Sequence, residues 1–156
     1  MVSVTIESVG SGYGGLKTKV KKVRKFVEAS KRDIVFRQRV LQLVRGLAWK
    51  DHDGEIMAAV DLAQRVRYVR DPVGVELITD PRILLEQILS GEAAGEDCDG
   101  LVTLLSAVLE TLGYETRYRI GREGHERYVH IWLEVLHPRR GWVPIETTIY
   151  GVRVGF

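Results

Sequence analysis

Three residues in the second half of the chain have the side chains of a cysteine acyl-transfer site: Cys98, His130 and Glu146. In such a site an imidazole takes the proton of the thiol, and a carboxylate orients the imidazole. Cys98 is the only cysteine among the 156 residues, and it stands between Asp97 and Asp99. Whether the three side chains can meet depends on the helices and strands that carry them.

Cys98 lies at the start of the clearest predicted helix, in which Gly113 is a typical C-terminal stop. Asp97 is the expected N-cap, so Cys98 takes the first helical position. There its backbone N–H has no partner within the helix and is a candidate oxyanion-hole donor, and the positive end of the helix dipole favours a thiolate. The charges of Asp97 and Asp99 act against a thiolate, so the outcome depends on where their side chains point. Apolar residues form one stripe of this helix: Leu101, Leu104, Leu105, Val108, Leu109 and Leu112.

His130 lies in the second of four segments whose apolar residues alternate. Alternation puts His130 and Trp132 on one face of the strand and the apolar Ile131 and Leu133 on the other. His130 is therefore not expected on the core face. The four predicted strands cover residues 116–120, 128–136, 142–147 and 150–154.

Glu146 comes from the next strand, across a connection at residues 137–141. If Leu136 pairs with Trp142, Glu146 is the diagonal neighbour of His130, at a Cβ separation of about 7–8 Å. A register moved by two residues places Glu146 directly opposite His130, at about 5 Å. In either register the carboxylate reaches the imidazole.

The first half of the chain reads as helices. Helices followed by adjacent strands indicate an α+β domain with an antiparallel sheet. Residues 1–15 are expected to form a short edge strand and a Gly-rich arm, and residues 16–156 a single domain. The expected helices are a basic amphipathic one over 16–27, one from a Ser30/Asp33 capping box to Gly46, one over 54–67 capped by Asp53, and one from Asp80-Pro81 to Leu89.

Three motifs resemble the transglutaminase-like superfamily, which has a papain-like fold. They are "GEDCDGLVTLLSAVLETLGYETRYRI", "HIWLEV" and "GWVPIETT", and "VRYVRDP" at residues 66–72 is similar to the segment that precedes the nucleophile. The likeness covers about residues 50–150 and implies that Cys98, His130 and Glu146 form the catalytic triad. "DCDG" is also close to the Asp-Cys-Asp-Asp of small bacteriophage and prophage members, which implies host cytoplasm or virion as the location.

The resemblance has departures and implies further roles. The third triad residue is usually Asp in the family, and Thr147 replaces the usual proline. Relatives supply a second oxyanion donor from an upstream side chain, for which Tyr68 is the candidate here. Trp132 and Trp142 flank the expected site and are candidate substrate-binding residues. The calcium sites of the animal enzymes have no match in this chain.

The expected activity is attack of Cys98 on an amide carbon through a thioester acyl-enzyme. Hydrolysis by a peptidase or amidase is favoured, because a small open domain has little to exclude water. Transfer to an amine, as in a transglutaminase, is the alternative. A third alternative is a catalytically inactive binding or virion-assembly module that uses the basic helix as its contact surface.

The charge distribution and the cysteine content indicate which partner and which compartment to expect. Residues 1–50 carry 12 Lys/Arg and 3 Asp/Glu, and residues 51–156 carry 11 and 18, so the basic helix at 16–27 is a candidate contact for an acidic or nucleic-acid partner. A single cysteine forms no internal disulfide, which favours a reducing cytoplasm. No apolar run reaches the roughly 18 residues of a membrane span. No metal or cofactor is expected, and the remaining histidines, His52, His125 and His137, are expected at the surface.

Overall fold

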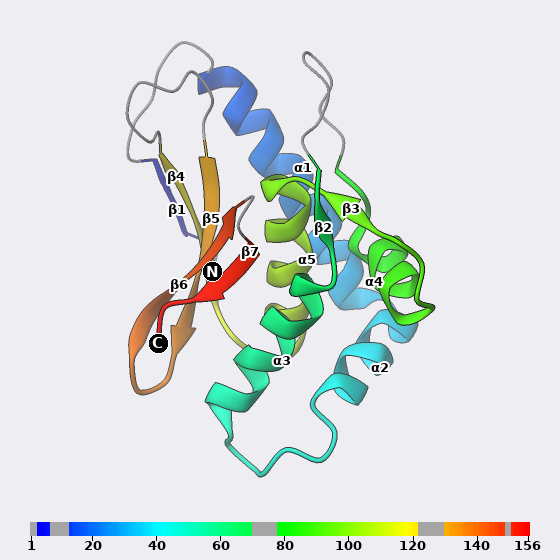
Figure 1. The fold of residues 1–156 in the computed structure, drawn as a ribbon. Coiled ribbons are helices and arrows are strands. Elements are labelled where there is room, and N and C mark those ends of the chain that lie inside the picture. Colours follow the sequence, from blue (N-terminus) through cyan, green and yellow to red (C-terminus); the bar gives the residue numbers. More distant parts are fainter. Residues whose placement is uncertain (1–2, 7–12, 70–77, 122–129, 149–150) are drawn as a thin grey trace.

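A sheet with helices on one side of it forms the framework of the protein (Figure 1). The structure is a computed structural model, and it describes residues 3–6, 13–69, 78–121, 130–148 and 151–156. The helices in these ranges are α1 (Tyr13–Arg32), α2 (Ile34–Leu43), α3 (His52–Gln64), α4 (Pro81–Leu89) and α5 (Cys98–Thr111). The strands are β1 (Ser3–Ile6), β2 (Arg67–Tyr68), β3 (Gly95–Glu96), β4 (Thr116–Gly121), β5 (His130–His137), β6 (Gly141–Thr148) and β7 (Gly151–Val154).

The large sheet has the strand order β1-β4-β5-β6-β7. Strands β4 to β7 are antiparallel neighbours, as the alternating pattern predicted, and this part of the sheet carries the residues of interest. Strand β1 adds to the edge in parallel with β4. Strands β2 and β3 form a separate two-stranded parallel ribbon immediately before α5. The α+β fold class is confirmed.

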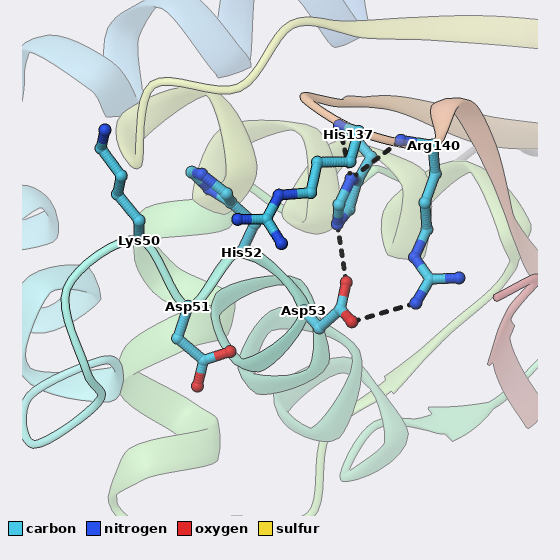
Figure 2. Close-up of a pocket in the computed structure, with 7 residues that line it drawn as sticks. Lys50, Asp51, His52, Asp53, His137 and Arg140 are labelled. Atoms are coloured by element: carbon cyan, nitrogen blue, oxygen red, sulfur yellow. Dashed lines mark hydrogen bonds and ion pairs between the residues drawn. The ribbon is translucent and has the colours of Figure 1, made fainter.

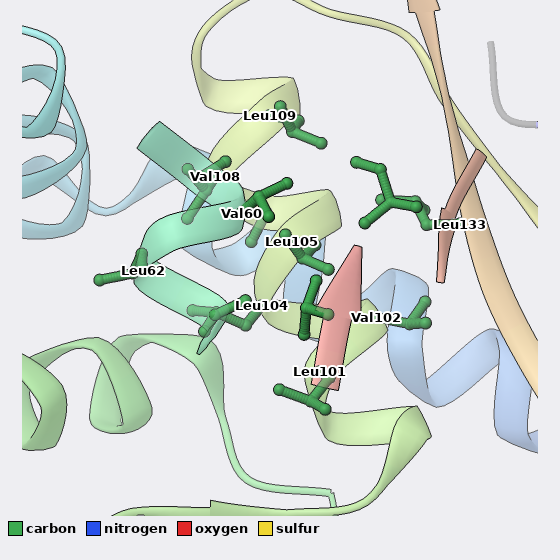
Figure 3. Close-up of a cluster of buried hydrophobic side chains, with 14 of the residues drawn as sticks. Val60, Leu62, Leu101, Val102, Leu104, Leu105, Val108, Leu109 and Leu133 are labelled. Atoms are coloured by element: carbon green, nitrogen blue, oxygen red, sulfur yellow. The ribbon is translucent and has the colours of Figure 1, made fainter. Parts of the chain in front are cut away.

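Helix α5 is the central helix, with the sheet on one side and α1, α3 and α4 around it (Figure 1). Every residue from Asp99 to Leu109 is buried, which explains why this segment is apolar around most of its circumference. Its leucines and valines meet Val60 and Leu62 of α3 and Leu133 of β5 (Figure 3). The helix ends as predicted, because Gly113 adopts φ +97°, a left-handed conformation that favours glycine.

Two of the predicted helix starts are wrong. Asp33, rather than Ser30, caps α2, because α1 continues to Arg32 and the Ser30 hydroxyl donates to the Phe26 carbonyl inside it. Asp51, rather than Asp53, caps α3. Asp80 caps α4 as predicted, with its carboxylate accepting from the backbone N–H of Arg82 at 2.9 Å.

The N-terminal strand is present where it was predicted, and it belongs to the large sheet. Helix α1 begins at Tyr13, so the predicted domain boundary at residue 15 falls inside this helix. The first part of the Gly-rich arm, residues 7–12, lies outside the described residues.

The basic helix is divided between the interior and the surface. Lys19 and Arg24 of α1 form ion pairs with Asp99 and Glu110 of α5, so these two cations hold the helix in place. Lys21, Lys22 and Lys25 are exposed. An acidic or nucleic-acid partner for this helix stays a prediction. Over the described part of the chain, no helix is both long enough and apolar enough to cross a membrane.

Candidate active site

Cys98 is the first residue of α5, as its spacing from the apolar stripe predicted. The carboxylate of the N-cap Asp97 accepts from the backbone N–H of Asp99 at 3.1 Å and of Gly100 at 3.4 Å. Glu96 lies against the same first turn, because a Cβ on Gly100 would collide with its carboxylate. Glycine at position 100 therefore lets a buried acidic side chain pack beside the helix start.

His130 and Glu146 lie together on the face of the sheet that points away from α5. Leu136 pairs with Trp142, so the diagonal register is confirmed and the register with Glu146 directly opposite His130 is excluded. The imidazole Nε2–H donates to Glu146 Oε2 over 3.3 Å. The longer side chain of Glu spans the diagonal distance between the two strands, so an acid–imidazole pair forms despite the departure from Asp.

The thiol of Cys98 meets β5 at the residue after His130. A backbone hydrogen bond with Ile131 acts on the Cys98 sulfur, and the carbonyl of Ile131 accepts from Thr147 Oγ1 at 3.2 Å. Among the described residues, the β5–β6 pairs run from Leu133 opposite Ile145 to His137 opposite Gly141. The start of α5 thus contacts the backbone of β5 at the residue that follows His130, whereas the side chains of His130 and Glu146 lie on the other face of the sheet.

The thiol of Cys98 donates its hydrogen bond to an acid of its own helix. Cys98 Sγ donates to Asp99 Oδ1 over 3.7 Å, and none of the hydrogen bonds among the described residues joins the sulfur to the His130 ring. The other oxygen of the same carboxylate, Asp99 Oδ2, is 2.9 Å from Lys19 Nζ of α1. In this conformation the Cys98 thiol is bound to Asp99, and the His130 imidazole is bound to a different acid, Glu146.

The electrostatic question raised by the flanking aspartates has an answer in this geometry. Burial, and then the charge of Asp99, raise the pKa of the Cys98 thiol to about 12, and Asp97 contributes in the same direction. The hydrogen bond with Ile131 and the charge of Lys19 lower that pKa without overcoming the rise. Burial and the neighbouring acids together therefore favour the neutral thiol at the start of this helix.

The other predicted site residues fall into two groups. Tyr68 pairs with Glu96 across the β2–β3 ribbon, which brings it to the strand that leads into Cys98. Trp132 stacks on His130, with ring centroids 5.7 Å apart. Trp142 is opposite Leu136, six residues along β5 from His130 or about 20 Å, and it packs under the Arg117 guanidinium. Tyr68 thus lies beside the strand that precedes Cys98 and Trp132 lies against His130, whereas Trp142 is remote from His130.

A second histidine–carboxylate pair occupies the opposite end of β5 (Figure 2). His137 is buried, which contradicts the predicted surface position, because β5 runs one residue further than expected and the alternation then directs His137 inward. Its Nε2–H donates to Asp53 at 2.6 Å, and its Nδ1 accepts from the backbone N–H groups of Arg139 and Arg140. A longer strand assignment would have found this residue from the sequence.

The pocket beside His137 has the features of a structural site. Hydrogen bonds from Arg140 and then His137 lower the pKa of the Asp53 carboxyl, so the pocket's main acid is already paired. His52, also a lining residue, is half-buried, and its Nδ1 is 2.9 Å from the Tyr114 hydroxyl. His125 lies outside the described residues. No three His, Cys, Asp or Glu side chains converge on a metal site within the described ranges.

The fold and the site together define a class of protein. Its features are a cysteine at the first position of a central helix, an antiparallel sheet against that helix, and a histidine–carboxylate pair on adjacent strands beside the cysteine. The family model for the core of the transglutaminase-like superfamily matches residues 42–147, and the chain belongs to this superfamily. The superfamily consists in general of cysteine-dependent acyl-transfer proteins. No curated protein matches the chain, and the bacteriophage type stays a prediction.

Proposed function

We propose that this protein hydrolyses amide bonds through a Cys98 thioester, as a peptidase or amidase. The observation that carries the proposal is the His130–Glu146 hydrogen bond of 3.3 Å, located beside the strand residue whose backbone contacts the thiol. Cys98 is the proposed nucleophile, His130 the base and Glu146 the group that orients it. Family membership supports acyl transfer as the type of chemistry.

The proposed reaction uses the two nitrogens of His130 differently. Nε2–H is committed to Glu146, so Nδ1 accepts the thiol proton as the sulfur attacks the acyl carbon. The C–N bond then breaks, and the imidazolium returns the proton to the leaving amine. Water, deprotonated by Nδ1, attacks the thioester carbon; the C–S bond breaks, the acid leaves, and the imidazolium returns the proton to the Cys98 sulfur. The Cys98 backbone N–H and the Tyr68 hydroxyl are the proposed donors to the oxyanion.

Exposure of the orienting acid supports water as the acceptor. The Glu146 side chain is 46% exposed and that of His130 is 16% exposed, so solvent reaches the carboxylate that binds the imidazole. Trp132, stacked on the same imidazole, is the proposed contact for a substrate side chain. An amine acceptor would make the same acyl-enzyme a transglutaminase.

One observation favours the inactive alternative. The raised pKa of Cys98 and its hydrogen bond to Asp99 describe a thiol that is not yet activated. A binding module would keep the fold and leave the three side chains unused, with the exposed Lys21, Lys22 and Lys25 as its contact surface for an acidic or nucleic-acid partner.

Product analysis separates these functions. Dimethylated casein, a glutamine-containing protein, is incubated with the purified chain, and peptide release, ammonia release and incorporation of a dansylated amine are measured. We expect hydrolysis products that disappear in Cys98→Ser and fall by about 10²–10⁴ in His130→Ala, because general base catalysis contributes this much. His52→Ala is the matched control and is expected to retain activity. Amine incorporation without hydrolysis would identify a transglutaminase, and products that persist in Cys98→Ser would refute the mechanism.

A further inference from the structure

A buried ion pair between α1 and α5 is in direct contact with the proposed nucleophile. The side chains of Lys19 and Asp99 are 14% and 5% exposed, and their charged atoms are 2.9 Å apart. The carboxylate uses Oδ2 for this lysine and Oδ1 for the Cys98 thiol. One acid therefore links a helix that carries none of the three proposed catalytic residues to the sulfur atom.

The charges around the thiol are unequal in number. Two buried carboxylates besides Asp99 lie at the start of α5, on Glu96 of β3 and on the N-cap Asp97. The strands contribute His130 and its partner Glu146. From α1 comes Lys19, which is the cation that lowers the thiol pKa. A thiolate formed here meets several negative charges, and Asp99 is the one that contacts the sulfur.

We propose that Asp99, held in place by Lys19, is a positioning residue that keeps Cys98 as a neutral thiol directed away from His130. Activation then requires the sulfur to exchange its hydrogen bond with Asp99 for one with the imidazole. Lys19 acts in the opposite sense, because its ammonium offsets the carboxylate charge beside the thiol. The role of His130 rests on the proposed function, but the effect of the Lys19–Asp99 pair on the thiol does not.

The inference predicts opposite effects for the two members of the pair. Asp99→Asn removes the negative charge and leaves the ammonium of Lys19 beside the sulfur, so a thiolate forms more easily. Lys19→Gln leaves the carboxylate without its cation, so a thiolate forms less easily. If the pair served only to hold α1 on α5, both substitutions would loosen the site and both would expose the thiol.

The rate of alkylation by iodoacetamide, measured from pH 6 to 10, tests this because Cys98 is the only cysteine. We expect Asp99→Asn to react at least about 10-fold faster at pH 7.5 and its pH profile to move to lower pH by about one unit. Lys19→Gln is expected to react more slowly than the wild-type chain. Asp61→Asn, which removes an exposed acid from α3, is the charge-matched control and is expected to change neither.

Two results would overturn the inference: an unchanged or slower reaction of Asp99→Asn, or a faster reaction of both variants. Circular dichroism checks that each variant is folded, and the direction of the Lys19→Gln effect alone decides the matter if Asp99→Asn does not fold. The proposed function is tested by a different measurement, the casein products, and can fail while this inference holds. A faster Asp99→Asn together with casein products that persist in Cys98→Ser would refute the catalytic mechanism and leave the Lys19–Asp99 pair supported.

Discussion

Helix α5 is held by α1 at both of its ends, and the two ends differ in the charges that surround the acid. Near the C-terminal end, Glu110 accepts from Arg24 at 3.0 Å and from Lys31 at 3.1 Å. The hydroxyls of Ser106 and Thr116 donate to the same carboxylate. At the N-terminal end, Asp99 pairs with Lys19 and shares its surroundings with the buried Glu96 and Asp97.

The difference shows how one kind of contact serves two purposes. Burial raises the pKa of Glu110, but hydrogen bonds from Arg24 and Thr116 outweigh it and hold the pKa at about 2. The contacts of Glu110 at this end therefore stabilise the packing of α1 on α5. At the other end, burial and then the charge of Asp99 raise the pKa of Cys98. That end controls the protonation of the Cys98 thiol, and further cations there would lower the pKa of the thiol.

The largest expected contrast comes from replacing each acid by its amide. Glu110→Gln leaves the Arg24 and Lys31 charges with less compensation in a part-buried network, and we expect a loss of about 3 kcal/mol in the free energy of unfolding. Asp99→Asn removes one of several neighbouring carboxylates, and we expect a loss of about 1 kcal/mol or less. Urea denaturation at pH 7 measures both values. Equal losses would contradict the contrast between the two ends.

Acid should weaken the C-terminal end by a smaller amount. The pKa of Glu110 is about 2 in the folded chain, below the ordinary value of 4.5, so its stabilisation is complete well above pH 4.5 and is lost as the pH falls toward 2. At pH 3.5 the expected loss is about 1 kcal/mol. The measurement is the difference in unfolding free energy between the wild-type chain and Glu110→Gln at pH 6 and pH 3.5. A difference that stays constant would show that Glu110 is not the titrating group.

Glu28→Gln should have the smallest effect. Glu28 pairs with the same two cations, Arg24 and Lys31, but its side chain is 41% exposed. Solvent screening limits such a pair to about 0.5 kcal/mol. Thermal and urea unfolding of this variant, compared with Glu110→Gln, separates the buried partner from the exposed one. A loss as large as that of Glu110→Gln would assign the anchor to Glu28 instead.

Local patterns were sufficient for the fold class and for part of the site. The alternation in β5 predicted the face of His130, and one of the two registers considered for β5 and β6, with Leu136 opposite Trp142, is the one observed. Capping by Asp97 was also predictable, because the acid, the helix start and the apolar stripe are adjacent in the sequence. These features depend on residues a few positions apart or on two consecutive strands.

The missed features depend on contacts between distant segments. The pairing of Lys19 with Asp99 requires knowledge of how α1 crosses α5, and helical periodicity contains no such information. The His137–Asp53 contact joins β5 to the first turn of α3. The charge balance at Cys98 follows from these tertiary placements, so the sequence motif alone could not determine the state of the thiol.

The order of segments along the chain has a consequence for synthesis. Arg24 and Glu110 are 86 residues apart, and α1 leaves the ribosome before α5. At about 5–20 residues per second, Glu110 is synthesised roughly 4–17 s after Arg24. The interval between the synthesis of β1 and that of its partner β4 is longer still, because β4 follows α5. The nascent chain therefore carries α1 for seconds with Glu28 of the same helix as the partner of Arg24 and Lys31, and Lys19 can meet Asp99 only after the start of α5 has been synthesised.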